Sequence, residues 1–134
     1  MYFYNVYGPR EANYGEHSTV VRAFKNQILE GKSLRIYGTG KKSRDFTHVK
    51  DVVVGVANLI VAKKKIKEAH FGSKHPYTIQ EIADAFDHPV VHEFERVGEA
   101  EYTICEEPYI KRSYDVIEYI RDWKGRWNDA QSSS

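Results

Sequence analysis

Two arginines, Arg44 and Arg96, have the chemistry and the positions needed to hold a phosphate group. Arg44 comes at the start of a predicted strand directly after the glycine turn at residues 38–40, and Arg96 follows another predicted strand. Two guanidinium groups can clamp a diphosphate through paired hydrogen bonds, which lysine side chains do less specifically. Most arginines are surface charges, so the pair alone fits a solvated surface as well as a diphosphate site.

Two further spacings in this stretch match cofactor or catalytic motifs only in part. Gly38-x-Gly40 has no third glycine, and residues 41–46 do not start a helix as a dinucleotide-binding loop requires. Tyr37-x-x-x-Lys41 has the spacing of the catalytic pair of short-chain dehydrogenases, in which both side chains share one helical face and the lysine lowers the tyrosine pKa. Glycines at positions 38 and 40 disfavour a helix, so we reject both motifs and predict a plain turn.

The histidines and the cysteine do not form a recognisable metal or nucleophile motif. The six histidines lack metal-ligand spacing, and Cys105 is the only cysteine, which excludes an internal disulfide and a cysteine-based zinc site. His48 and His92 are predicted to make ordinary hydrogen bonds. The serines and Cys105 have no nucleophile context. We therefore predict no metal site and no catalytic residue in this chain.

Composition indicates a single globular domain. The chain has 134 residues, of which 41% are hydrophobic and 29% charged, and a domain is predicted over residues 1–128 with a disordered tail at 129–134. The formal net charge of +1 gives no field for binding nucleic acid or acidic membranes. The longest apolar segment, residues 52–62, is too short to span a bilayer, and no signal peptide is visible. These features predict a cytoplasmic protein.

Hydrophobic periodicity predicts alternating strands and helices. Thr78-x-x-Glu81 is a capping box that starts one helix, and Gly31 is a natural stop for another. The predicted strands cover residues 2–7, 34–37, 44–47, 69–72, 90–95 and 102–105, and the predicted helices cover 19–30, 49–65, 79–86 and 115–123. The lysines of residues 63–67 are predicted to form a solvated helix end.

The predicted helix at residues 49–65 is unusual because its valines, leucine and isoleucine point in every direction around the helix. A helix that is apolar all round is normally buried on all sides. A chain of this length has little room to bury one completely. Two interpretations stay open: a central core helix, or a helix with one face that packs on a sheet absent from this chain.

Four blocks of the sequence resemble, in order, the C-terminal half of the extended short-chain dehydrogenases, the NAD(P)-dependent sugar-nucleotide epimerases and dehydratases. The blocks are "YFYNVYGPRE", "GKSLRIYGTGKKSRDFTHVKDVV", "HFGSKHPYTIQEIADAF" and "ERVGEAEY". The resemblance implies an α/β fold: the C-terminal substrate-binding portion of a Rossmann-type enzyme, without its N-terminal cofactor-binding half. In the family, the glycine-rich cofactor loop and the catalytic Tyr-x-x-x-Lys both precede the "NVYGPR" block.

The resemblance also implies a substrate half-site made of seven residues. They are Asn5, beside the sugar; Leu34 and Tyr37, along the base; Arg44 and Arg96, on the diphosphate; Tyr77, near the nucleotide; and Glu99, near the ribose. The chain departs from the family pattern at Tyr2, where arginine is usual, at His70, where asparagine is usual, and at residues 74–76, which replace a glycine-rich stretch.

Two functions are therefore open. In the first, the chain holds a nucleoside-diphosphate sugar, and a separate Rossmann-domain chain supplies NAD(P), the family's cofactor, which this chain alone is not expected to bind. In the second, it is a non-catalytic module that binds a nucleotide sugar or associates with itself. A homo-oligomer is expected if no such partner exists, because the strand at residues 2–7 and the apolar helix would lack neighbours.

Overall fold

The computed structural model describes residues 2–10, 19–62, 68–94, 104–106, 108–109 and 112–132. Its strands are β1 (Tyr2–Phe3), β2 (Val6–Tyr7), β3 (Leu34–Tyr37), β4 (Ser43–Asp45), β5 (Thr47–His48), β6 (His70–Phe71), β7 (Pro76–Thr78) and β8 (Val90–Glu93). Its helices are α1 (Val20–Leu29), α2 (Val49–Val61), α3 (Ile79–Ala85) and α4 (Val116–Ser132). The predicted α/β class is confirmed.

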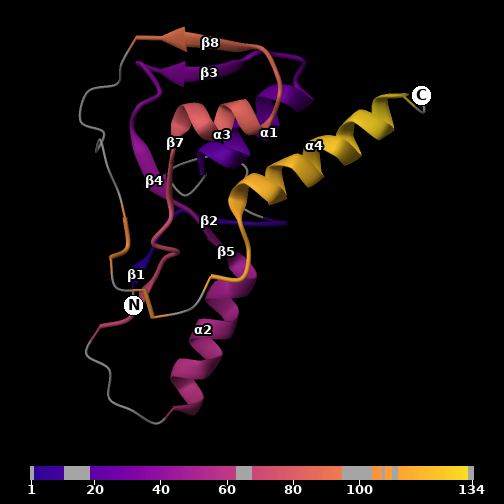
Figure 1. Cartoon of the computed structure of the whole chain (residues 1–134). Coiled ribbons are helices and arrows are strands. Elements are labelled where there is room, and N and C mark those ends of the chain that lie inside the picture. The colour runs from indigo at the N-terminus through magenta and orange to yellow at the C-terminus, as the bar shows by residue number, and fades with distance from the viewer. Residues whose placement is uncertain are drawn as a thin grey trace.

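The strands form four short pairs. Three pairs are parallel, β1 with β6, β2 with β5 and β3 with β8, and the fourth, β4 with β7, is antiparallel. Figure 1 shows β3 and β8 at one end of the molecule and β1 toward the other, with β4 and β7 running between them. The β4–β7 pair therefore links the two ends of the structure.

Two hydrophobic cores follow from this arrangement. The main core lies where α1, α3 and α4 meet β3, and it includes Phe24, Ile36, Ile82 and Ile120, each almost completely buried. The small core lies between α2 and β6 and contains the buried residues Val52, Ala69 and Phe71.

Local sequence signals set the ends of α1 and α3 as predicted. The Thr19 hydroxyl accepts a hydrogen bond from the backbone N–H of Arg22 at the start of α1, and Gly31 (φ +74°) follows the end of that helix. At α3, Thr78 and Glu81 make both hydrogen bonds of the capping box. The predicted capping box is confirmed.

Helix α2 is not a central core helix, so the first of the two interpretations is wrong. Val53, Val54, Ile60 and Val61 are 62%, 58%, 74% and 76% exposed. Helix α2 packs against β2 and β5 and covers Ala69 and Phe71 of the small core, while these four side chains stay exposed. The second interpretation, one apolar face without a cover, agrees with these exposures.

Other predicted boundaries shift. Helix α4 continues to Ser132, past the predicted end at Trp123 and into the segment predicted to be disordered. Its stripe of inward-facing residues continues to Trp127, which packs on the main core. Ile104 and Cys105 lie in no strand, against the prediction for residues 102–105, and α2 ends at Val61 rather than residue 65. Residues 63–67 lie outside the described residues.

No helix within the described ranges is both long and apolar enough to cross a membrane. The same ranges contain no group of three or more histidine, cysteine, aspartate or glutamate residues placed to hold a metal ion.

Candidate functional site

Three of the predicted site residues, Asn5, Arg44 and Tyr77, gather around strand β4. Arg44 and Tyr77 are direct partners across the antiparallel β4–β7 pair. The Asn5 side-chain amide donates a hydrogen bond of 3.1 Å to the backbone carbonyl of Asp45, the residue after Arg44. All three side chains are half-buried, so each is partly accessible to a ligand.

The backbone of Asn5 lies in the left-handed region, with a φ of +36°. Asparagine tolerates this conformation better than most residues because its short amide can bond locally, here to the Asp45 carbonyl. The turn separates β1 from β2 and so aims the Asn5 side chain at β4.

Arg44 is oriented by its own strand. Its Nη1 donates a 2.8 Å hydrogen bond to the Ser43 carbonyl, which leaves its other guanidinium N–H groups available for an acceptor. Lys41 and Lys42 precede β4 in the same run, so this stretch of chain is cationic. A diphosphate is a ligand that such a run could hold.

Leu34 and Tyr37 lie on β3, which pairs with β8 and not with β4. Leu34 is 0% exposed, belongs to the main core and donates its backbone N–H to the Pro89 carbonyl, so neither its side chain nor its backbone is open to a ligand. Tyr37 is half-buried at the end of β3. Arg96 and Glu99, the remaining predicted site residues, lie outside the described residues.

The rejected motif at Tyr37 and Lys41 is indeed not a helical pair. Strand β3 ends at Tyr37, and Gly38 and Gly40 have φ values of +84° and +78°, typical of a turn. The turn leads into strand β4, not into a helix N-terminus. This turn therefore does not fit the pyrophosphate of NAD(P), which needs a glycine turn opening onto a helix.

Asp45 is a functional neighbour that the sequence analysis missed. Its carboxylate is 0% exposed and accepts four hydrogen bonds, from Ser73 N (2.8 Å), Ser73 Oγ (2.5 Å), Lys74 N (2.9 Å) and Cys105 N (2.9 Å). It ties β4 to the loop after β6 and to residue 105, directly beside Arg44 and Asn5. The one signal in the sequence for this role was the position of Asp45 inside a predicted strand, because a charged residue can be buried there only if it has hydrogen-bond partners.

A second polar cluster holds Tyr77 in place. The Tyr77 hydroxyl donates a 2.5 Å hydrogen bond to Asp115 Oδ1, which also accepts from Arg112 Nη1 at 2.8 Å. Burial, and then the hydrogen bond and charge of Asp115, raise the pKa of the Tyr77 phenol, while Arg112 partly opposes that shift. Tyr77 is therefore protonated near neutral pH and fixed as a donor to Asp115.

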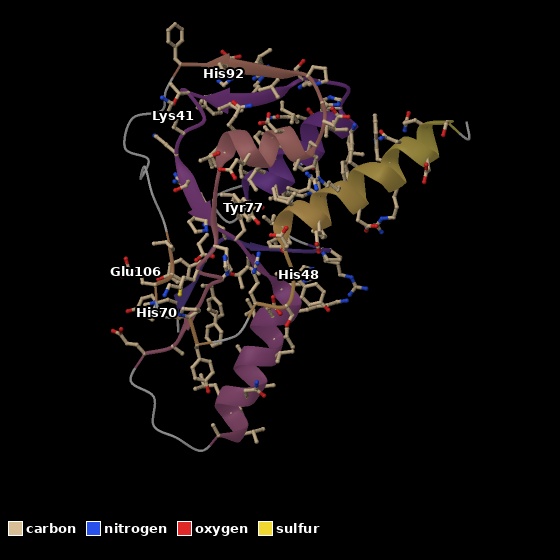
Figure 2. The ribbon with its side chains drawn as sticks, viewed as in Figure 1. Lys41, His48, His70, Tyr77, His92 and Glu106 are labelled. Atoms are coloured by element: carbon tan, nitrogen blue, oxygen red, sulfur yellow. The ribbon has the colours of Figure 1, made fainter. Side chains whose placement is uncertain are left out.

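Two histidines play the ordinary roles predicted for them. His48 Nδ1 accepts a 3.0 Å hydrogen bond from Lys50 N and so caps the start of α2. His92 Nδ1 lies 2.9 Å from the Gly38 carbonyl, which holds the turn after β3. Figure 2 shows the two histidines far apart, with Tyr77 between them in the view.

A family model described as the NAD dependent epimerase/dehydratase family matches residues 1–73. A UDP-N-acetyl-alpha-D-glucosaminuronate decarboxylase of Bacillus cytotoxicus is 33% identical over 71% of this chain and 29% of its own length. A putative UDP-glucose 4-epimerase of Methanocaldococcus jannaschii is 33% identical over 82% of this chain and 34% of its own length.

Solved structures share the fold. The UDP-glucose 4-epimerase of Thermotoga maritima, determined with UDP-glucose, has a TM-score of 0.75 at 24% identity and matches 96% of this chain. That match covers 45% of the enzyme, so this chain spans under half of the solved relative and about a third of the two curated ones. The chain belongs to the NAD-dependent epimerase/dehydratase family.

Proposed function

We propose that this chain holds the nucleoside-diphosphate sugar of an NAD(P)-dependent epimerase or dehydratase, and that a separate cofactor-binding polypeptide completes the enzyme. The observation that carries the proposal is the meeting of Asn5, Arg44 and Tyr77 around β4, beside a buried carboxylate that fixes the surrounding loops. Its support from relatives is the UDP-glucose bound to the Thermotoga enzyme and the UDP-glucuronic acid bound to an epimerase of Bacillus cereus.

The proposed roles follow the chemistry of each side chain. The Arg44 guanidinium binds a diphosphate oxygen pair, the Asn5 amide bonds a sugar hydroxyl or phosphate, and the Tyr77 ring lies against the nucleotide. Arg96 and Glu99, outside the described residues, are proposed to add the second guanidinium and a ribose contact. The reaction itself then depends on a hydride carrier, which the proposal assigns to the separate cofactor-binding polypeptide.

Calorimetric titration of UDP-glucose, with UDP, ADP-glucose and GDP-mannose for comparison, tests the proposal. Arg44→Ala is expected to weaken binding by about 1.5–3 kcal/mol, roughly tenfold or more, the scale of charge-assisted hydrogen bonds. Arg44→Lys keeps the charge but not the planar fork, so an intermediate loss is expected. Arg35→Ala, an exposed arginine on β3, is the matched control and should leave affinity unchanged.

Three outcomes would contradict this proposal. Equal affinity of wild type and Arg44→Ala for the nucleotide sugar would mean that the ligand does not bind around β4. If no nucleotide sugar binds, only the second function stays open. Saturable binding of NADH by this chain would contradict the proposed division between two polypeptides.

The second function, a non-catalytic and self-associating module, is favoured by one observation. Helix α2 exposes four large aliphatic side chains, and surfaces of this kind commonly mark interfaces. A monodisperse monomer in light scattering would count against it.

A further inference from the structure

A pocket of about 820 Å³ lies between α2 and the segment that leads into α4. Pockets for small organic ligands usually measure about 300–1,000 Å³, so this one is large enough for such a ligand. Its apolar and aromatic lining comes from Val49, Val53 and Val54 on the helix and from Tyr109 and Tyr114 on the segment. Figure 1 shows this segment passing the end of α2 at which the helix begins. The pocket shares no residue with the site around β4.

The two tyrosines that form the walls of the pocket are held in place by the rest of the structure. The Tyr109 backbone N–H donates a 2.8 Å hydrogen bond to a carbonyl of β6, and its ring packs edge-on against the buried Phe71, with 5.8 Å between centroids. The Tyr114 ring stacks on His48 with 4.4 Å between centroids, and its backbone N–H donates to Asp51 Oδ2. The walls are therefore fixed before a ligand binds, which lowers the entropic cost of binding.

The helix side of the pocket is apolar and accessible to solvent. Val53 and Val54 are 62% and 58% exposed, and Val49, one turn before Val53, is half-buried. A planar ring system can contact aliphatic side chains and phenol rings at the same time, and it removes the apolar surface of both from water. The lining therefore favours a ligand with a flat, apolar body.

The charges at the pocket favour an anion. Two of the described residues that line it, Lys50 and Asp51, are charged. Asp51 is 5% exposed, and its Oδ2 accepts hydrogen bonds from the backbone N–H groups of Ser113 (3.1 Å) and Tyr114 (3.2 Å), so its charge is stabilised within the protein. Lys50 is exposed, and its ammonium lies 5.8 Å from the centre of the Tyr114 ring. The charge that a ligand meets in the pocket is therefore positive.

This positive charge lies at one end of the pocket. Lys50 belongs to the first turn of α2, where the helix dipole is also positive. Ser113 lines the pocket beside this turn, and a serine hydroxyl can donate a hydrogen bond to a carboxylate. Val54 and Asn58, further along the helix, carry no charge. A fitting ligand thus has its negative group at the start of α2 and its apolar body along the helix.

We infer that this pocket binds a small aromatic carboxylate, with the carboxylate at Lys50 and Ser113 and the ring system between Tyr109 and Tyr114. The inference does not depend on the proposed function, because the two sites have no residue in common. A neutral aromatic compound would gain nothing from the charge of Lys50, and a purely polar anion would gain nothing from the valines and the tyrosine rings.

Calorimetric titration with 2-naphthoate and 2-naphthamide tests the inference, because the two probes share one ring system and differ in charge. 2-Naphthoate should bind one-to-one with a dissociation constant of about 1 mM or lower, the scale for a ligand of this size, and more tightly than 2-naphthamide. Lys50→Gln should weaken 2-naphthoate binding by about threefold to fivefold, as expected for one exposed charge pair, and leave 2-naphthamide unchanged. Lys32→Gln removes a 57% exposed lysine outside the pocket and is the matched control.

Two variants of α2 separate the pocket from the exposed surface of the helix in general. Val54→Glu places a carboxylate in the lining and should weaken the binding of both probes by about fivefold or more. Val61→Glu places the same charge on the same helix, on a valine that is 76% exposed and does not line the pocket, and it should bind both probes as wild type does. Both variants should keep the wild-type circular dichroism spectrum, because the replaced side chains are exposed.

Five results would each overturn the inference. They are no saturable binding of 2-naphthoate, equal affinities for the two probes, and a loss of affinity in Val61→Glu as large as in Val54→Glu, which would indicate general adsorption to the helix. Displacement of 2-naphthoate by UDP-glucose would place the probe in the nucleotide-sugar site instead. An affinity that falls as the concentration of this chain rises would mean that a second copy of the chain fills the pocket.

Discussion

Replacing Asp45 with asparagine should destabilise the chain strongly, although the change removes only a charge and one acceptor. An asparagine side chain keeps one oxygen, which can serve Lys74 N and Cys105 N, and its NH₂ group can donate to Ser73 Oγ. The Ser73 N–H then stays buried without an acceptor, at a cost of about 1–3 kcal/mol. The two remaining bonds also lose their ionic character, so the free energy of unfolding should fall by about 2–4 kcal/mol.

Urea unfolding followed by circular dichroism near neutral pH measures this loss. Asp122→Asn is the matched control, because that carboxylate is 71% exposed in a surface ion pair with Arg126, and such pairs contribute about 0–1 kcal/mol. Asp45→Ala should not fold, since the buried N–H groups of Ser73 and Cys105 and the part-buried N–H of Lys74 would lose their acceptor in a domain whose whole stability is about 5–15 kcal/mol. An Asp45→Asn protein within about 0.5 kcal/mol of wild type would refute the reasoning.

Two further pairs of variants test packing and burial. Gly72→Ala should lower the free energy of unfolding by about 1–3 kcal/mol, because its new Cβ would lie 2.2 Å from the Cβ of Cys105. A Cβ added at Gly125 in α4 meets nothing within 4 Å, so Gly125→Ala should stabilise the helix by about 0.5–1 kcal/mol. Tyr7→Phe should preserve stability, because the buried Tyr7 hydroxyl has no partner in the described structure, while Tyr77→Phe should lose about 1 kcal/mol with its hydrogen bond. Burial raises the pKa of both phenols above the ordinary 10.0. Their contribution to the free energy of unfolding is therefore complete below pH 10.0 and falls at higher pH. Tyr7→Phe should reduce this loss of stability, measured by urea unfolding at increasing pH.

The parts of the fold predicted correctly from sequence are those fixed by neighbouring residues. The capping box of Thr78 and Glu81 and the stop at Gly31 each depend on side chains or φ angles within a few positions. The sequence could not predict whether α2 is buried or exposed, because periodicity identifies the apolar faces of a helix and not the elements that cover them. The continuation of α4 to Ser132 was missed because its stripe is sparse, with Trp127 the last residue on the main core.

Part of the candidate site could likewise be predicted from the sequence, and part could not. The resemblance supplied Asn5, Arg44 and Tyr77, and the register of β4 against β7 places Tyr77 opposite Arg44. Asp45 could not be recognised as their support, because its partners lie 28 to 60 residues further along the chain. Contacts of that sequence separation follow from the fold and not from any local pattern.

The two cores differ in a way that bears on the proposed ligand site. The main core closes on itself: β3, α1, α3 and α4 bury its members from several sides, so this end of the molecule has the apolar burial that folding requires. The small core has three buried residues under one helix, and its outer residues face solvent. Arg44 and Asp45 lie on the β4–β7 pair that joins the two ends (Figure 1). Because Asp45 fastens this pair to the loop after β6, the ligand site depends on the half-open end as well as on the closed one.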